Sequence, residues 1–562
     1  MTGAVTVRSR IVNNLTAVRL GYLGWVSVIV ALLVLAPIVA VVINIFLPSQ
    51  DTLAHLASTV LPDYIWNTLR LIALVALGVI LLGVISAWLV TAYRFPGQRV
   101  LEWALVLPLA MPAYVMAYAY TDWLQAAGPV QTLLRDLTGW KVRDYWFPEI
   151  RSLPGAATML SFALYPYVYL LARTAFLEQS RTTMEAARLA GYDAWGRFWR
   201  VALPLARTGI VAGTALALME ALADFGTVSY FAVNTFTTGI YRAWLSLGDP
   251  VAAGQLATCL LLFVLVMLSL ERRHRGGARY AAKRTPMPPQ TLRGAPAALA
   301  SIICAIPIAL GFLVPTVVLL KLAATDPEAQ FDARIYGLVL NTATLSGVAA
   351  VAAVAVALLL AYAARTVRSP LVDGANRLAV LGYALPGAVI AVGILLPVGK
   401  FDNAVAAWLQ EQFGIKTGLL LTGSITALIY AYLVRFLAVA FHTVEAGLTR
   451  VTPSMDDAAR SLGLSPGRTL ARVHVPIMWG SFATAAMLVF VDVMKELPAT
   501  FAMRPFNFDT LAVEAYNLAK DERIAEAAVP SLVMVGIALL PLILLSRQIT
   551  RSSLNKSPNR ND

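Results

Sequence analysis

Five ionisable side chains interrupt two apolar stretches of this 562-residue sequence and could bind or steer a charged solute: Glu220, Asp224, Asp492, Lys495 and Glu496. The acids of each stretch are four residues apart, so in a helix both carboxylates of a pair lie on one side. Carboxylate oxygens suit a hard cation, and ionisable groups in apolar stretches usually line a cavity. We predict that the five residues line a pathway for a cation. The alternative is that they stabilise helix packing or a gate and never contact the solute.

Composition indicates the kind of element that carries these charges. The sequence is 59% hydrophobic and 13% charged, whereas soluble domains carry about 25% charged residues. Its mean hydropathy is +0.71, and its apolar runs are long enough to cross the roughly 30 Å hydrocarbon core of a bilayer. An ordinary soluble enzyme is therefore excluded. The sequence predicts an all-α polytopic membrane protein with about twelve transmembrane helices.

The predicted spans fall into two groups of equal size. A linker rich in Gly, Pro and Arg at 271–296, expected to be cytoplasmic, separates a first half at 1–270 from a second half at 297–562. The spans are predicted at 20–47, 65–93, 100–125, 153–177, 207–231, 250–270, 297–321, 336–364, 371–399, 416–441, 479–502 and 526–546.

The two halves are copies of one unit. Residues 185–204 align with 457–476 at an offset of 457 − 185 = 272, and the acidic pairs of the two stretches align at the same offset. Asn67 and Thr68 align with Asn341 and Thr342 at 341 − 67 = 274. Each half has an even number of predicted spans, so the halves run parallel through the membrane. We expect a pseudo-two-fold axis along the membrane normal, with the pathway on it.

The net charge of +13, from 44 Lys and Arg against 31 Asp and Glu, could indicate a polyanionic partner. The basic residues instead gather in alternate loops, before the first span, in the linker and in the carboxyl-terminal tail. By the positive-inside rule these segments are cytoplasmic, so both termini are expected in the cytoplasm. The expected partner is therefore a lipid bilayer, and no nucleic acid is expected.

The sequence lacks the residue patterns of several other kinds of site. Cys259 and Cys304 lie in apolar spans without CxxC spacing, so neither a disulfide framework nor a zinc site is expected. The four histidines also lack ligand spacing and are interpreted as ordinary polar residues. The string nearest to a phosphate-binding loop, GILLPVGK at 393–400, has one residue too many and no Ser or Thr after the Lys. We therefore expect no ATP hydrolysis by this chain.

A loop motif occurs once in each half, as EAARLAGYDAWGRFWRVALP at 185–204 and DAARSLGLSPGRTLARVHVP at 457–476. Gly191 and Gly463 are predicted at a positive φ, where one short helix turns into another. Pro204 and Pro476 are predicted in the first turn of the next span, where a missing N–H costs nothing. Each motif thus predicts a helix-turn-helix that continues into a membrane helix, a suitable lever between a soluble partner and the pathway.

The motif resembles the EAA signature of the membrane subunits of binding-protein-dependent ABC importers. Two copies in one chain resemble the fused permeases of the ferric-iron importer family. The resemblance covers residues 60–547, including LMEALADFGTVSYFAVNTFTTGIYRAW at 218–244 and VMKELPATFAMRPFNFDTLAVEAYNLAKDERIAEAA at 493–528.

In this family each motif docks into a cleft of an ATPase subunit. The resemblance implies that one ATPase contacts Glu185, Ala186, Ala187 and Gly191, and the other Asp457, Ala458, Ala459 and Gly463; Pro204 and Pro476 complete the two coupling loops. Asp457 stands where the family motif has Glu, which shortens the reach and leaves open whether the two docks are equally strong.

The resemblance further implies a permease of the bacterial inner membrane that takes ferric iron from one periplasmic binding protein and is driven by two ATPase subunits. ATP and Mg²⁺ would bind to those subunits, and neither a cofactor nor a fixed metal site is expected in this chain. Thiamine, polyamines, aminophosphonates and oxyanions stay open as cargo, because selectivity in such systems resides largely in the binding protein. An ion-coupled secondary transporter is an alternative of another class, although it has no reason to carry two such loops.

Overall fold

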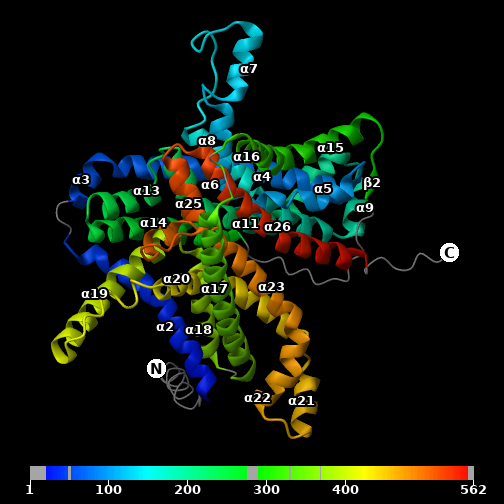
Figure 1. The fold of residues 1–562 in the computed structure, drawn as a ribbon. Helices are drawn as coiled ribbons and strands as arrows, with labels where there is room; N and C mark the ends of the chain where they lie inside the picture. The colour runs from blue at the N-terminus through cyan, green and yellow to red at the C-terminus, as the bar shows by residue number, and fades with distance from the viewer. Residues whose placement is uncertain are drawn as a thin grey trace, which may run out of the picture. The chain divides into compact units, whose positions relative to one another are not determined.

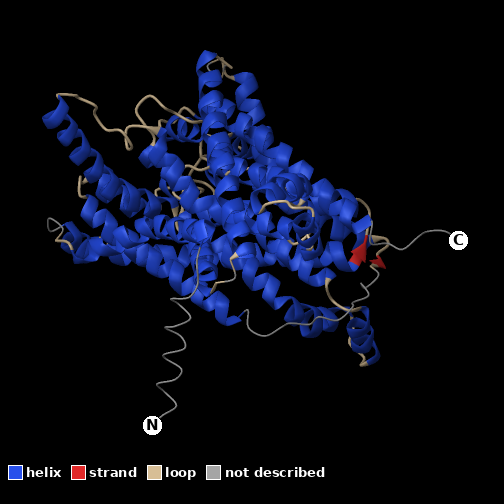
Figure 2. Ribbon diagram, turned by 90° about the horizontal axis from the view of Figure 1, so that it is seen from below, coloured by secondary structure: helices blue, strands red, loops and turns tan. Residues whose placement is uncertain are grey.

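The computed structural model describes residues 21–48, 52–274, 289–327, 329, 331–367 and 369–554. Helices make up nearly all of this part of the chain (Figure 2), and its only strands are the parallel pair β1 (Tyr93–Arg94) and β2 (Gln290–Thr291). The predicted all-α architecture is therefore confirmed. Most of the predicted linker and the basic residues that precede the first span lie outside the described residues.

The chain forms two compact units, each described here on its own. Unit 1 comprises Met1–Ala40, Ala343–Leu385 and Gly393–Val493, and unit 2 comprises Val41–Thr342, Pro386–Val392 and Met494–Asp562. The borders between the units run through single helices, so the units differ from the two halves of the sequence. The boundaries of the halves at 270 and 297 stay a prediction.

Unit 2 contains most helices of the first half, together with the first and the last helices of the second half. They are α3 (Thr52–Thr59), α4 (Leu61–Ala92), α5 (Gln98–Ala104), α6 (Ala113–Leu124), α7 (Pro129–Thr138), α8 (Leu153–Leu177), α9 (Arg181–Leu189), α10 (Ala194–Arg197), α11 (Leu203–Ala223), α12 (Gly226–Tyr230), α13 (Phe236–Tyr241), α14 (Pro250–His274), α15 (Ala295–Ile308), α16 (Val314–Thr325), α24 (Pro498–Met503), α25 (Leu511–Lys520) and α26 (Ile524–Leu554). Short 3₁₀ or π turns accompany them: η1 (Asn44–Phe46), η2 (Leu107–Ala110), η3 (Phe198–Ala202), η4 (Arg242–Ser246) and η5 (Ala309–Leu313).

The helices of unit 1 come mainly from the second half. They are α2 (Gly21–Ile43), α17 (Ala333–Thr366), α18 (Pro370–Ala379), α19 (Gly387–Phe413), α20 (Ile425–Leu448), α21 (Pro453–Ser461), α22 (Pro466–Thr469) and α23 (Val475–Met494), with the turns η6 (Val380–Ala384) and η7 (Leu470–His474). The last residues of α2, the first turns of α17 and α19, and the end of α23 belong to unit 2.

Eleven helices of the described residues are long and apolar enough to cross a membrane, and a bent pair makes twelve if it counts as one span. The predicted span at 100–125 corresponds to the bent pair. It consists of Gln98–Ala110 and Ala113–Thr138, which meet at 93°. Pro112 lies between them in an extended conformation. Proline lacks the N–H of a helical bond and disfavours helical geometry in the residue before it, which accounts for the break.

Several predicted span limits are also wrong. The predicted spans at 207–231 and 479–502 correspond to helices at Ala194–Ala223 and Gly467–Met494, and those at 371–399 and 416–441 to Gly387–Phe413 and Ile425–Leu448. Two of these helices begin earlier than predicted because they continue from the polar loop motifs. Hydropathy alone does not detect a helix that extends beyond the apolar core of the membrane.

The first helix of each half packs in the unit formed mainly by the other half. In unit 1, the hydroxyl of Tyr430 on α20 donates to the carbonyl of Leu33 on α2 (2.5 Å). In unit 2, the hydroxyl of Tyr120 on α6 donates to the carbonyl of Leu310, in the turn η5 that joins α15 to α16 (2.6 Å). The two halves therefore exchange their first helices, an arrangement that the sequence repeat does not reveal.

Small residues bring α4, α8 and α11 into close contact in unit 2 (Figure 1). A Cβ added at Gly83 would lie 2.7 Å from the Cβ of Val168, and one at Gly213 would lie 2.7 Å from the Cα of Val168. Close backbone approach of this kind is how membrane helices gain packing energy without a hydrophobic driving force. The packing fixes the membrane helix that follows the first loop motif.

Replacement of Gly83 by Leu is expected to destabilise unit 2, because the new side chain meets the backbone nitrogen of Tyr169 at 2.9 Å from its Cβ position. The expected loss is about 1–3 kcal/mol or more of unfolding free energy. The measurement is the midpoint of thermal unfolding in detergent. Gly536→Ala is the matched control, since Gly536 lies in α26 with open space around it. An unchanged midpoint for Gly83→Leu would contradict the packing.

Candidate functional site

The first loop motif, residues 185–204, together with residues 181–184 before it, folds as a short helix, a glycine turn and a second helix. Helix α9 ends at Leu189, and Gly191 takes a φ of +84°. The N–H of Gly191 donates to the carbonyl of Arg188 and the N–H of Tyr192 to that of Ala187, both at 3.1 Å. These two bonds form a Schellman motif, which satisfies carbonyls left open at a helix end.

The second loop motif, residues 457–476, together with residues 453–456 before it, repeats this backbone. Helix α21 ends at Ser461, and Gly463 takes a φ of +77°. Its N–H donates to the carbonyl of Arg460 (2.9 Å), and the N–H of Leu464 donates to that of Ala459 (3.0 Å). The predicted positive φ of both glycines is therefore confirmed, and the two copies share one turn geometry.

A π-helical turn precedes the proline of each loop motif, which the sequence does not predict. In the first, η3 spans Phe198–Ala202 and the N–H of Leu203 bonds back to the carbonyl of Phe198. In the second, η7 spans Leu470–His474 and the N–H of Val475 bonds to the carbonyl of Leu470. The wider turn accommodates a proline that cannot complete the normal helical bond.

Pro204 and Pro476 lie in the first turns of α11 and α23, as predicted, but each of these helices continues without a break from the π turn before it. Each proline lies inside a continuous helix, Ala194–Ala223 or Gly467–Met494, of 30 and 28 residues. A 30-residue helix is about 45 Å long, whereas the hydrocarbon core of a bilayer is about 30 Å thick. The predicted continuity between the loop motif and a membrane helix is confirmed.

The two loop motifs present the same side chains to solvent. Glu185 and Ala186 are exposed while Ala187 is buried, and the aligned Asp457 and Ala458 are exposed while Ala459 is buried. Large apolar side chains are exposed beside them, with Leu189 at 90%, Trp195 at 68% and Leu462 at 80%. Exposed apolar residues gathered beside polar ones are typical of a surface that binds another protein.

Neutral side chains support the first loop motif. Met184 is buried, and the ring of Trp88 lies 5.2 Å from that of Phe176 and 5.3 Å from that of Phe198. The side-chain amide of Gln179 donates to the carbonyl of Ala202 (2.7 Å), so it holds the π turn against the end of α8.

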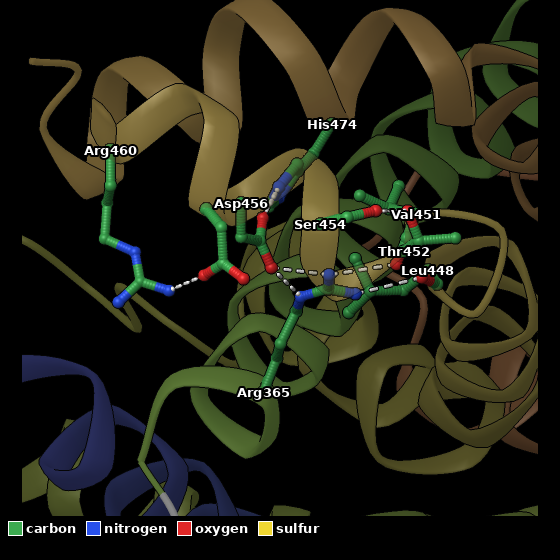
Figure 3. Close-up of polar contacts among 9 residues, drawn as sticks. Arg365, Leu448, Val451, Thr452, Ser454, Asp456, Arg460 and His474 are labelled. Atoms are coloured by element: carbon green, nitrogen blue, oxygen red, sulfur yellow. Dashed lines mark hydrogen bonds and ion pairs between the residues drawn. The ribbon is translucent and has the colours of Figure 1, made fainter. Parts of the chain in front are cut away.

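Charged side chains support the second loop motif (Figure 3). Nη2 of Arg365 donates to Oδ2 of Asp456 at 2.6 Å, and Nε2 of His474 lies 2.6 Å from Oδ1 of the same carboxylate. Burial raises the pKa of Asp456, but the hydrogen bonds from Arg365 and His474 outweigh it, so the pKa of this carboxyl is below its ordinary value. His474 is only 1% exposed, a burial that the sequence does not indicate.

The acids Asp224 and Glu496 each cap a short helix after a membrane helix. The carboxylate of Asp224 accepts from the N–H of Val228 (3.1 Å) and the hydroxyl of Thr227 (3.0 Å) at the start of α12. Glu496 accepts from the N–H groups of Ala499 (2.9 Å) and Thr500 (3.0 Å) at the start of α24. The aligned acids therefore perform the same structural task in both copies.

An aromatic cluster joins these two capped segments within unit 2. The central cluster consists of Phe225, Tyr241, Phe501 and Tyr516, the first two from the first half and the others from the second. The rings of Phe225 and Phe501 are 5.7 Å apart, and those of Phe501 and Tyr516 are 5.5 Å apart. The hydroxyl of Tyr241 donates to the carbonyl of Pro498 (2.5 Å). Segments that correspond in the repeat thus meet in one packed layer.

The other predicted pathway residues are divided between the units. Glu220 lies on α11 and Lys495 follows α23, both in unit 2, whereas Asp492 lies on α23 in unit 1. Glu220, Asp492 and Lys495 are half-buried. The predicted grouping of these charges around one pathway stays a prediction.

Two stretches of the chain, residues 79–274 and 361–553, match the family described as the binding-protein-dependent transport system inner membrane component. The chain belongs to this family. Each match contains one loop motif, so the two predicted homologous halves are confirmed. The predicted membership of a two-loop permease family is confirmed with them.

Relatives of this permease carry several cargo names. The chain is 26% identical over 488 residues to the Fe(3+)-transport system permease protein FbpB 2 of Haemophilus influenzae, covering 86% of this chain and 89% of the relative. It is 31% identical over 201 residues to the sulfate transport system permease protein CysW of Escherichia coli, covering 35% of this chain and 66% of the relative. The molybdenum transport system permease protein ModB of Escherichia coli is 30% identical to the chain over 222 residues, covering 38% of this chain and 93% of the relative.

Family membership establishes the general role of the permease. It is a multi-pass inner membrane component of an ABC importer, it translocates a solute and is not an enzyme. A binding-protein-dependent system works with an ATPase and a solute-binding protein, so both kinds of partner are implied.

Proposed function

We propose that this chain is the permease of a ferric-iron importer, fed by one periplasmic binding protein and driven by two ATPase subunits. The similarity to the Haemophilus influenzae Fe(3+)-transport permease supports iron, because it extends over 86% of this chain and so reaches both halves. The sulfate and molybdenum permeases match only about a third of the chain. The similarity to this iron permease over both halves is the observation that carries the choice of cargo.

Each loop motif docks one ATPase subunit in this proposal. The docking residues are Glu185, Ala186, Ala187 and Gly191 in the first loop motif and Asp457, Ala458, Ala459 and Gly463 in the second. ATP and Mg²⁺ bind to the ATPase subunits, and the chain itself needs no cofactor. The loop motifs and both termini lie in the cytoplasm, as the distribution of Lys and Arg favours.

Continuous helices carry the motion from the docks to the pathway. Closure of the ATPases on ATP draws the two loop motifs together, and the helices that contain Pro204 and Pro476 tilt with them. Such a helix transmits the displacement because its turns, including the π turn, keep one unbroken rod from Ala194 to Ala223. The central cluster lies just beyond the end of this rod at Phe225, where the displacement would open it.

The ionisable residues of the apolar helices line the pathway in this proposal. Glu220, Asp224, Asp492 and Glu496 attract a cation, and Lys495 moderates the negative field. Asp224 and Glu496 also cap α12 and α24, so their carboxylates link the charge of the pathway to the shape of the segments that close it. A hard trivalent cation suits carboxylate oxygens.

Reconstitution with the cognate ATPase and binding protein tests the cargo. Liposomes that contain the complex and enclosed ATP are expected to accumulate radiolabelled ferric iron when the binding protein is added, with unlabelled ferric iron as competitor. The binding protein purified from its host is expected to hold ferric iron. Accumulation of sulfate or molybdate, or an organic ligand in the binding protein, would overturn the assignment to iron while leaving the importer architecture intact.

A further inference from the structure

The side chains that support the two loop motifs differ in charge at equivalent positions of the repeat. Thr91 aligns with Arg365 at the repeat offset of 365 − 91 = 274, and Met184 with Asp456 at 456 − 184 = 272. Ala202 aligns with His474 at the same 272. The three charged or polar residues that support the second loop motif therefore replace three residues without ionisable groups in the first.

In the first loop motif, the residues at these positions hold the motif in place without charged groups. Thr91 and Met184 line one small pocket together with Trp88, Ala92, Phe176, Leu177 and Gln179. The hydroxyl of Thr91 donates to the carbonyl of Ala87 (2.8 Å) in its own helix α4, so it forms no hydrogen bond to the loop motif there. Packing around Met184 and the Gln179 bond to Ala202 hold α9 in place.

The second loop motif has an arginine that joins three segments. Arg365, in the last turn of α17, donates through Nη2 to the carboxylate of Asp456 on α21. It also donates through Nη1 to the carbonyl of Leu448 (3.1 Å) at the end of α20, and through Nη2 to the carbonyl of Val451 (2.9 Å) in the turn before α21. Figure 3 shows the guanidinium between the carboxylate and these carbonyls.

His474 extends the same network into the π turn. Its Nε2 contacts the second oxygen of Asp456, and its ring lies 5.7 Å from the ring of Tyr362, one turn before Arg365 on α17. Tyr362 aligns with Trp88 at the offset of 362 − 88 = 274. The aromatic support is therefore kept in both copies, and the ionic bonds are added in the second.

We propose that Arg365, Asp456 and His474 form an ionic clamp that positions the second loop motif, whereas the first loop motif has a neutral support. This inference rests on the proposed function, since the clamp matters for transport because the loop motif docks an ATPase. The clamp fixes α21 to the ends of α17 and α20 and to the start of the α23 rod. The two ATPase docks, alike in their motif, thus differ in what holds them.

A clamp of this kind is vulnerable when one member is removed. Side chains of Arg365 and Asp456 are 19% and 25% exposed, so water replaces a lost partner only in part. Removing one charge leaves the other partly buried without compensation, which costs more than removing the whole set. Replacement of all three by the residues of the first loop motif gives a neutral support of the kind that the chain already uses there, except that Val451 stands at the position of Gln179 (451 − 179 = 272).

Spin labels on the chain alone test the clamp. Cys259 and Cys304 are replaced by Ala, and a label is placed at Ser461→Cys or at the aligned Leu189→Cys, both exposed positions. Arg365→Thr is expected to shorten the rotational correlation time of the label at 461 and to leave that at 189 unchanged. The triple variant Arg365→Thr, Asp456→Met, His474→Ala is expected to return the label at 461 close to its original mobility.

Uptake per ATP hydrolysed, in the reconstituted complex, tests the link to transport. Arg365→Thr is expected to lower this ratio by about tenfold, and the triple variant is expected to recover most of it. Arg460→Thr is the matched control for label mobility, because Arg460 is 72% exposed in a surface pair that contributes little to stability. It is expected to leave the mobility at 461 unchanged.

Each contrary result removes a defined part of the inference. Unchanged mobility at 461 in Arg365→Thr overturns the clamp, and a triple variant as mobile as the single one overturns the equivalence of the two supports. Increased mobility with an unchanged ratio of uptake to ATP reduces Arg365 to a structural residue. Failure of the unmodified complex to take up any solute overturns the proposed function instead, and the label comparison still decides the clamp.

Discussion

Aspartate in place of Gly191 or Gly463 is expected to leave the permease in the membrane but to prevent ATP hydrolysis from driving uptake. Both glycines have a positive φ and nothing within 4 Å of an added Cβ, and Asp tolerates this backbone region better than most residues. The turn therefore survives. The new carboxylate lies at the carboxyl end of α9 or α21, in the surface proposed to dock the ATPase, where an unpaired charge would lose its water on binding.

The expected penalty is about 3 kcal/mol, or more than about 100-fold in the affinity for the ATPase. The measurements are membrane content by immunoblot, co-purification of the ATPase, and uptake coupled to ATP hydrolysis. Gly139→Asp is the matched control, because Gly139 has a φ of +72° and open space but lies after α7, outside both loop motifs. It is expected to behave as the unmodified chain.

Asparagine at the same positions separates charge from shape. Gly191→Asn and Gly463→Asn add a side chain of nearly the same size without the charge, and they are expected to retain more coupling than the aspartate variants. Coupled uptake at the normal rate in both aspartate variants would refute the assignment of the loop motifs as docks.

Alanine in place of Glu496 is expected to destabilise the segment that carries the central cluster and to abolish uptake. The N–H groups of Ala499 and Thr500 would lose their acceptor, and both residues are only 1% exposed. An unsatisfied buried N–H costs about 1–3 kcal/mol, so the two together cost about 2–6 kcal/mol of unfolding free energy. The measurement is thermal unfolding in detergent, together with uptake in liposomes.

Glutamine at the same position distinguishes the cap from the charge. Glu496→Gln keeps one acceptor oxygen for α24, so its unfolding midpoint is expected to stay much closer to that of the unmodified chain. Its uptake of ferric iron is expected to fall, because the proposed pathway loses a negative charge. Asp224→Asn is the matched variant in the first half, where the same kind of cap holds α12. Normal uptake in both amide variants would restrict these acids to a structural role.

The sequence predicted those features of the permease that depend on residues close together in the chain. Gly191 and Gly463 are recognisable because a helix that must stop between two polar segments needs a residue that accepts a positive φ. The repeat offset predicted that both copies fold alike, and the structure bears this out down to the two hydrogen bonds of each turn.

Features that depend on contacts distant in the sequence were not predictable. The π turns before Pro204 and Pro476 resolve a conflict between a proline and a continuous helix, and either resolution, a break or a wider turn, suits the sequence. His474 lacks any neighbour in sequence that marks it as buried, since its partner Asp456 is 18 residues away and Arg365 lies in another helix. The exchange of first helices between the halves likewise depends on packing alone.

The alignment of the two halves contains the clearest sequence signal for the charged side chains that support the second loop motif. Positions 184, 202 and 91 change from residues without ionisable groups to Asp, His and Arg at 456, 474 and 365, and three charge-bearing substitutions in register indicate a shared contact. Comparison of the repeats position by position, rather than for their common motif, would have predicted it.

Each π turn also changes the angle, measured around the helix axis, between the residues before it and the residues after it. An α-helical residue advances the chain by about 100° around the axis. One extra residue in η3 or η7 therefore rotates the residues that precede the π turn relative to those that follow it. The π turns therefore set the angle, around each helix axis, between the proposed docking residues and the proposed pathway residues.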